Sequence, residues 1–209
     1  MVRVLLYSLI STVVLGVYYP PQADINAYHN ARQAVKANPA DVMAQFNLAM
    51  NYAYTGRVIK GINLLKEVNK TDPALASKIV TTYQSKIARG EHTWLDYFKL
   101  GFGLYFTGES DASVDAFLAA HEMVPDQVWV MGYIALILAD QGEYDAAITW
   151  CQRALDYEYD LAGIHYLLGE AYSEQGESVK AFSHKARAVS LLTEEKLAHD
   201  YIYGTETSE

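Results

Sequence analysis

The sequence is poor in the residues that support disulfide, thiolate or nucleic-acid chemistry. Cysteine occurs once, as Cys151, so the chain can form neither an internal disulfide nor a metal site with several thiolates. Positive charge is also scarce, because 16 Lys and Arg residues stand against 25 Asp and Glu residues, for a formal net charge of −9. No basic run interrupts this balance, so a phosphate backbone would be repelled, and we predict no nucleic-acid partner.

Motifs that mark catalytic or cofactor-binding sites are missing from the sequence as well. It has no G-x-G-x-x-G or Walker loop, no H-E-x-x-H and no G-x-S-x-G, and its six histidines lack the spacing of metal ligands. His165 and Cys151 fall where packed side chains are expected, which favours structural roles for both. We therefore predict a protein that is not an enzyme and that binds no metal or cofactor.

Apolar residues, by contrast, are abundant, and at 51% of the chain they are enough to form a sizeable core. They are concentrated first in MVRVLLYSLISTVVLGVYYPPQ, where an uncharged run spans residues 4–19. As a helix this run would be about 24 Å long, short of the roughly 30 Å hydrocarbon core of a bilayer. A signal peptide and a short membrane anchor both stay open for residues 1–20, and so does a buried first helix.

A glycine-containing pattern recurs along the rest of the chain. It reads QGEYDAAITWCQRAL at 141–155, and its glycines Gly108, Gly142 and Gly176 are 34 residues apart. A fourth copy begins near Gly56, 52 residues before Gly108, which is one period plus an insertion of 18 residues. A helical segment precedes each glycine and another follows it, so each unit is predicted to be a helix, a turn and a second helix.

These units resemble the tetratricopeptide repeat family, whose signature combines L-G-x2-Y in the first helix, A-x3-F in the second and a closing proline. Leu168, Gly169 and Tyr172 reproduce the first-helix motif in the last unit, and Pro73 and Pro125 close the first two units. The resemblance covers residues 42–75 and 94–192. It implies an all-α fold, a right-handed α-solenoid of tetratricopeptide helix-turn-helix repeats.

Four segments lie outside the repeats. After the leader at 1–20, residues 21–41 are predicted to contain a lone repeat-like helix that ends near Pro39. Residues 76–93 form an inserted amphipathic helix, which we expect to kink the superhelix. Residues 193–209 are predicted to form a capping helix, which would shield the apolar side of the last repeat, and an acidic tail.

The resemblance also implies a binding site on the concave face, where one side of each first helix would form a groove. This groove is aromatic and nearly uncharged, which favours an apolar peptide or a helix of another protein as its ligand. The residues placed there are Met43, Phe46, Asn47, Met50, Phe98, Lys99, Phe102, Tyr105, Trp129, Tyr133, Leu136, Tyr166 and Glu170.

We therefore predict a non-catalytic scaffold or adaptor for protein–protein interaction. Residues 4–19 predict that it is anchored to a membrane or exported, and periplasmic or extracytoplasmic if the leader is a signal. Two alternatives stay open. The chain could be a structural subunit of a larger membrane or envelope assembly, its groove permanently occupied by that assembly or by its own leader. It could instead be an accessory subunit of a membrane enzyme. The partner, the side of the membrane and the oligomeric state are not specified by the residues.

Overall fold

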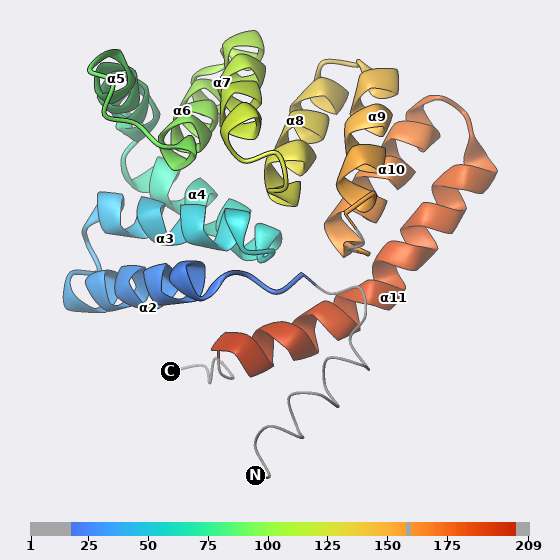
Figure 1. Ribbon diagram of the computed structural model, residues 1–209, viewed down its shortest axis with the longest axis horizontal. Coiled ribbons are helices and arrows are strands. Elements are labelled where there is room, and N and C mark those ends of the chain that lie inside the picture. Colours follow the sequence, from blue (N-terminus) through green and yellow to red (C-terminus); the bar gives the residue numbers. More distant parts are fainter. Residues whose placement is uncertain (1–17, 158–159, 204–209) are drawn as a thin grey trace.

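A computed structural model of the chain describes residues 18–157 and 160–203. Within these ranges the protein is all-α, as predicted, and its ten helices pack as antiparallel helix-turn-helix pairs (Figure 1). The repeat pairs are α3/α4, α6/α7, α8/α9 and α10/α11. The helices are α2 (Gln22–Ala37), α3 (Val42–Tyr54), α4 (Val58–Thr71), α5 (Leu75–Ala88), α6 (Trp94–Thr107), α7 (Ser110–Met123), α8 (Val128–Asp140), α9 (Tyr144–Leu155), α10 (Ala162–Glu174) and α11 (Ser178–Tyr203).

The recurrence of glycine after each first helix has a conformational cause. Gly56, Gly108, Gly142 and Gly176 follow the first helices of the four pairs with φ angles of 90°, 84°, 83° and 77°, the left-handed region that only glycine adopts without strain. A small residue in the second helix then lets the two helices approach closely. In α7, Ser113 is fully buried, and its hydroxyl donates to the carbonyl of Gly101 on α6 at 2.7 Å.

The segment predicted as an insertion, residues 76–93, holds most of α5. Leu75, Ile79 and Tyr83 bury the apolar face of α5, and this helix packs along α6, whereas it makes little contact with α4. In an uninterrupted array α4 would contact α6 in this way. Because α5 occupies the surface of α6 that α4 would otherwise cover, the first repeat does not stack on the second repeat and can take another position.

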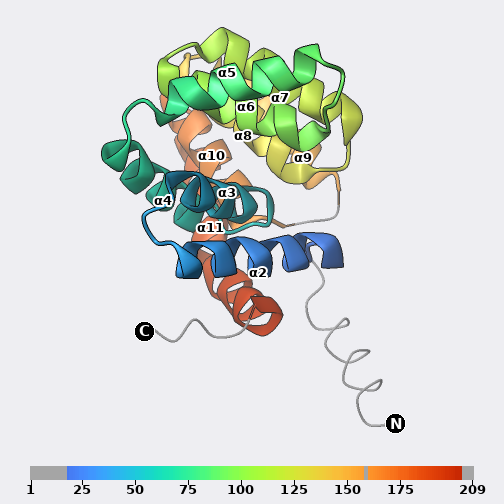
Figure 2. The same ribbon diagram turned by 90° about the vertical axis from the view of Figure 1, so that its left-hand side faces the viewer.

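Helices α5 to α11 follow one another around an arch, and α2 to α4 cross its inner side (Figures 1 and 2). In this arrangement α3 contacts α8, which is two repeats away along the chain. The phenol of Tyr133 on α8 donates to the backbone carbonyl of Ala53 on α3 at 3.3 Å. The four repeats therefore do not form a single superhelix around an open groove, because the first repeat lies inside the curve of the others.

The C-terminal segment also differs from the prediction of a separate capping helix after residue 192. Helix α11 runs without a break from Ser178 to Tyr203. The sequence SLLTEEKLAHD at 190–200 contains no glycine or proline that would end the helix. The far end of α11 instead returns to the start of the array, where the rings of Tyr203 and Tyr28 on α2 are 4.9 Å apart.

The leader prediction falls mainly outside the described residues, as does the acidic tail at 204–209. Of the run 4–19, only Tyr18 and Tyr19 are described. Over the described residues, none of the helices is both long enough and apolar enough to span a bilayer.

Candidate functional site

The aromatic side chains predicted to line a concave groove are brought together by the structure, but inside the core. Phe98, Phe102 and Tyr133 form a triangle with ring-centre distances of 5.2, 5.6 and 4.8 Å. Such edge-to-face pairs stabilise a core by about 0.5 to 1.5 kcal/mol each beyond the burial of their area. Six of the thirteen predicted site residues are buried: Phe46, Met50, Phe98, Phe102, Trp129 and Tyr133.

The first repeat covers this inner face. Phe46 and Met50 on α3 belong to the same core cluster as the aromatic residues of α6 and α8. Tyr54, at the end of α3, places its ring 6.0 Å from that of Phe98. The groove that the sequence predicts is therefore filled, in the described residues, by the protein's own helix α3.

The described end of the leader contributes to the same closure. Tyr18 is 8% exposed, and its ring lies edge-on to Trp129 with centres 5.8 Å apart. The turn at Gly56 lies against the same indole, since a Cβ atom added to Gly56 would be 3.0 Å from Trp129 and 3.3 Å from His199 on α11. Segments from the start, the middle and the end of the chain thus meet around Trp129.

Lys99 and Asn47, two polar members of the predicted site, bond to each other. The ammonium of Lys99 donates to the side-chain oxygen of Asn47 at 2.8 Å and lies 5.4 Å from the centre of the Tyr83 ring. Burial lowers the pKa of Lys99, since a partly desolvated ammonium is disfavoured, although the carboxylate of Asp96 opposes the shift. This pair links α3 to α6 across the inner face.

The remaining predicted residues lie at the margins of the inner face. Met43 and Leu136 are half-buried against the core. Tyr105 donates its hydroxyl to Asp140, and burial together with that carboxylate raises the pKa of Tyr105 to about 12. Glu170 pairs with Lys185 at 2.7 Å. Tyr166 is 54% exposed, which makes it the one predicted aromatic with most of its surface in water.

Exposed apolar side chains gather elsewhere, because five of the ten large apolar residues that are exposed in the described chain lie on α11. Val179 is 85% exposed, Phe182 75%, Val189 68% and Leu192 47%. We refer to this surface as the α11 face, and its residues are Val179, Phe182, Ala186, Val189 and Leu192.

Two positions of this face, those of Phe182 and Val189, correspond to residues that are covered in the preceding repeat. Ile148 on α9 is 34 residues before Phe182 and only 8% exposed, and Leu155, 34 residues before Val189, is half-buried. Helix α10 covers α9 there, as α8 covers α7. After α11 the described chain supplies no further first helix. Comparison of positions one period apart in the sequence would have identified this face.

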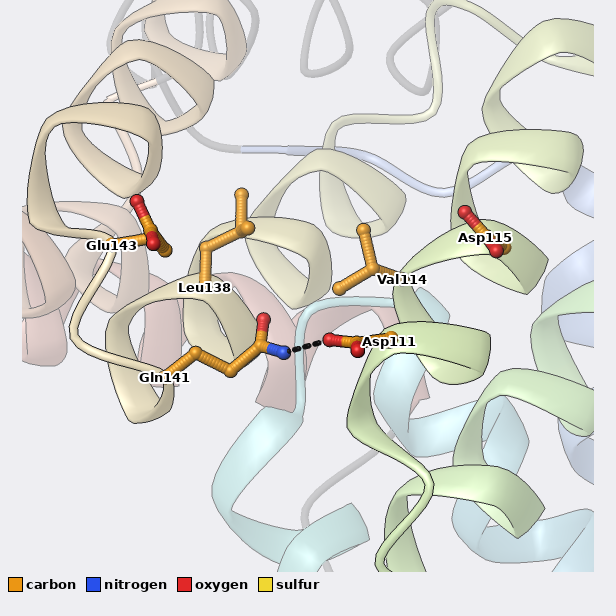
Figure 3. Close-up of a pocket in the computed structure, with 6 residues that line it drawn as sticks. All are labelled: Asp111, Val114, Asp115, Leu138, Gln141 and Glu143. Carbon is orange, nitrogen blue, oxygen red and sulfur yellow. Dashed lines mark hydrogen bonds between the residues drawn. The ribbon is translucent and has the colours of Figure 1, made fainter.

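A hydrogen bond between a glutamine and an aspartate recurs in two successive repeats and is missing at the start of α11. Gln141 donates to Asp111, and one period later Gln175 donates to Asp145 at 2.7 Å. The first of these bonds borders a shallow depression of about 590 Å³ that also includes Val114 and Leu138 (Figure 3). The next position in the aspartate series is Val179, so the polar link is replaced by an apolar side chain.

Two further groups were singled out in the sequence for their chemistry. Cys151 is 1% exposed, and burial raises the pKa of its thiol to about 12, so it is a buried structural side chain, as predicted. His165 bonds through one ring nitrogen to Asp160 at 2.6 Å and through the other to His184 at 2.8 Å. Over residues 18–157 and 160–203, no three His, Cys, Asp or Glu side chains are grouped so that they could hold a metal ion.

Comparisons with known proteins found one family match and several similar solved structures. Residues 135–176 match the family described as TPR repeat. A crystal structure of MamA protein is 21% identical over 90% of each chain, with a TM-score of 0.45. A crystal structure of YrrB, described as a TPR protein with an unusual peptide-binding site, is 14% identical, covers 82% of this chain and 96% of its own, and has a TM-score of 0.51. The likeness to YrrB shows a tetratricopeptide-like fold. No curated protein matches the sequence.

Proposed function

We propose that this protein is a non-catalytic scaffold for protein–protein interaction, and that it binds a helix on the α11 face. The tetratricopeptide-like fold supports the scaffold role. The α11 face is chosen as the binding surface because it is exposed, whereas the inner face is already covered by α3. This choice replaces the open aromatic groove expected from the sequence as the surface that a partner would contact.

One observation carries the proposal: α11 leaves Phe182 and Val189 exposed, whereas α10 covers Ile148 and Leu155, the corresponding residues of α9. A helix at the end of an array is soluble when its outer side is polar. Val179 and Phe182 are instead 85% and 75% exposed. Burying a side chain of this kind stabilises a complex by about 1.5 to 3 kcal/mol. A ligand helix would therefore gain most by lying where the next first helix of the array would lie.

A second candidate function, a structural subunit of a larger membrane or envelope assembly, is favoured by the contact between Tyr18 and Trp129. This contact brings the end of the leader to the covered inner face.

We propose that residues 4–19 attach the protein to a membrane or direct its export. Cell fractionation, with the intact mass of the mature N-terminus, tests this proposal, and a full-length chain recovered in the soluble fraction would contradict it. The accessory-subunit alternative stays a prediction.

Site-specific photo-crosslinking in cells tests the scaffold proposal. A photoreactive amino acid at Phe182 or Val189 should give a discrete crosslinked species, because these side chains would be covered by the partner. The matched controls are Ile59, an exposed apolar residue on α4, and Asn30, an exposed polar residue on α2. Absence of any crosslink at Phe182 and Val189 would show that the α11 face is unoccupied and would overturn the proposal.

A further inference from the structure

We infer that the helix bound on the α11 face belongs to a second copy of this chain, with the two α11 helices packed antiparallel. The inference rests on the proposed function of that face and names its occupant. It follows from the spacing of the exposed residues, their sizes, the pairing of the nearby charges and the different character of the other end of the array.

The exposed residues have the spacing of the apolar positions in a pair of coiled-coil helices. Val179, Phe182, Ala186 and Val189 follow one another at intervals of three, four and three residues. This alternation places side chains on one narrow stripe that can interdigitate with a like stripe on another helix. All four are exposed, so the stripe is continuous over about three turns of α11.

The order of sizes along the stripe makes it complementary to itself. When two such stripes run antiparallel with the centre near residue 184, Phe182 of each copy meets Ala186 of the other. Val179 of each copy then meets Val189 of the other. The large ring thus faces the smallest side chain in the two central layers, and valines face valines in the outer layers. Pairing of large with small residues fills the space between helices without strain.

The charges beside the stripe do not oppose this pairing. Each basic residue of the first half of α11 already has an acidic partner in its own chain. Lys185 pairs with Glu170 at 2.7 Å, Lys180 lies 3.6 Å from Glu177, and Arg187 pairs with Asp160. The surface around the stripe is therefore locally neutral, although the whole chain carries a net charge of −9.

The opposite end of the array does not match the α11 face. The exposed side of α2 carries Gln22, Asn26, His29, Asn30 and Gln33. A polar side of this kind would leave the stripe of a second copy in contact with hydrophilic groups, at a cost for each group left without a hydrogen bond. Stacking of copies head to tail is thus disfavoured, and a closed pair through two α11 faces is the arrangement that covers both stripes.

The exposed area sets the expected strength of the pair. Val179, Phe182 and Val189 would each lose roughly 100 Å² of apolar surface and Ala186 roughly 50 Å², or about 700 Å² over both copies. With the flanking polar residues, the total approaches the low end of specific interfaces, about 1,200 Å². We therefore expect a dimer that dissociates on dilution, with a Kd on the order of micromolar.

Disulfide trapping with the full-length chain tests the register. In the antiparallel pair, the two copies of residue 183 lie within about 3 Å along the helix axis, whereas the two copies of residue 190 are about 18 Å apart. Both are exposed serines on the same side of α11. Ser183→Cys should therefore give a covalent dimer under mild oxidation and Ser190→Cys should not. Cys151 is buried and does not compete.

A charged substitution in the stripe provides the matched equilibrium measurement. Phe182→Asp should raise the dimer Kd at least about tenfold in sedimentation velocity. Ile59→Asp, which changes an exposed apolar residue on α4, should leave the Kd unchanged. Circular dichroism of both variants checks that each one folds, and an unchanged Kd in a folded Phe182→Asp variant would overturn the inference.

The outcomes separate this inference from the proposed function. Trapping of both Ser183→Cys and Ser190→Cys to the same extent would indicate parallel or random association and would overturn the antiparallel pair. Trapping of neither, with a crosslink from position 182 to a different protein in cells, would overturn the self-pairing while the scaffold proposal stands. Trapping of neither, with no crosslink or one within the same chain, would overturn both.

Discussion

Phe98 on the inner face and Phe182 on α11 are the same kind of side chain in opposite surroundings. Phe98 is fully buried among five other aromatic rings, one of them from the first repeat, whereas Phe182 is 75% exposed. Both belong to repeats with the same helix-turn-helix plan. Their difference shows that an aromatic residue in a repeat indicates a binding surface only when the chain supplies nothing that covers it.

Truncation of the two phenylalanines tests this contrast most strongly. We expect Phe98→Ala to lower the free energy of unfolding by about 3 to 5 kcal/mol, because it removes a buried ring and leaves a cavity. Phe182→Ala should change it by no more than about 0.5 kcal/mol, since its ring is mostly in water. Urea denaturation of dilute protein measures both values, and similar losses would show that the two faces do not differ as described.

The next largest effect concerns the contact that joins the two ends of the array. The guanidinium of Arg57 lies 4.0, 4.4 and 3.5 Å from the ring centres of Tyr28, Tyr52 and Tyr203, and Arg57 is 4% exposed. We expect Arg57→Ala to cost about 2 to 4 kcal/mol, because desolvated cation–π contacts are strong.

Arg57→Lys is the control for charge in that contact. It keeps the cation but loses the planar group that stacks on the rings, so it should recover only part of the stability. Hydrogen exchange should show faster opening of the end of α11 in Arg57→Ala and little change in α7. Equal acceleration in both helices would indicate a general loss of packing instead.

A smaller effect is expected from pH where α11 is attached to α10. Burial lowers the pKa of His184, and the nearby His165 lowers it further. The unfolded chain therefore binds a proton there at a higher pH than the folded chain does, and stability falls as pH drops below about 6.5.

The variant His184→Gln should reduce this pH dependence, as measured by thermal unfolding between pH 5 and pH 8. Burial also lowers the pKa of His121, so His121→Gln serves as the comparison on α7. If the slope of stability against pH is the same in wild type and His184→Gln, protonation of His184 does not contribute to the pH dependence of stability.

The smallest change is expected at the polar contact of the inner face. Replacing Lys99 with methionine and Asn47 with leucine in the same variant should alter stability by no more than about 1 kcal/mol, because both hydrogen-bonding groups are removed together. Lys99→Met alone leaves the amide of Asn47 without this partner and should cost more. A large loss in the double variant would mean that this contact, more than the aromatic packing, holds α3 against α6.

The helix-turn-helix units were predictable because their cause is local. Glycine is needed for the left-handed turn, and small residues such as Ser113 and Gly101 are needed where two helices approach within one repeat. These requirements act over a few residues and therefore appear as a period in the sequence. The inserted helix at 76–93 was predicted for the same reason, from its own apolar face.

The placement of α3 inside the arch was not predictable from that pattern. Phe46 and Met50 would be apolar whether they lined an open groove or filled a closed one. The break at α5 is visible in the sequence, but the direction in which the first repeat turns depends on contacts such as Tyr133 with Ala53, far apart along the chain. The α11 face was missed because a cap was expected after residue 192, whereas α11 continues without a break and Phe182 stays exposed.

The contact between α3 and α8 has a consequence for how the protein folds and yields to force. Repeat arrays ordinarily fold from any point, because each unit touches only its neighbours. Here Ala53 must also meet Tyr133, 80 residues away, which requires closure of a long loop and slows the last step of folding. Pulling on the two ends would have to break this contact before the repeats could separate one by one.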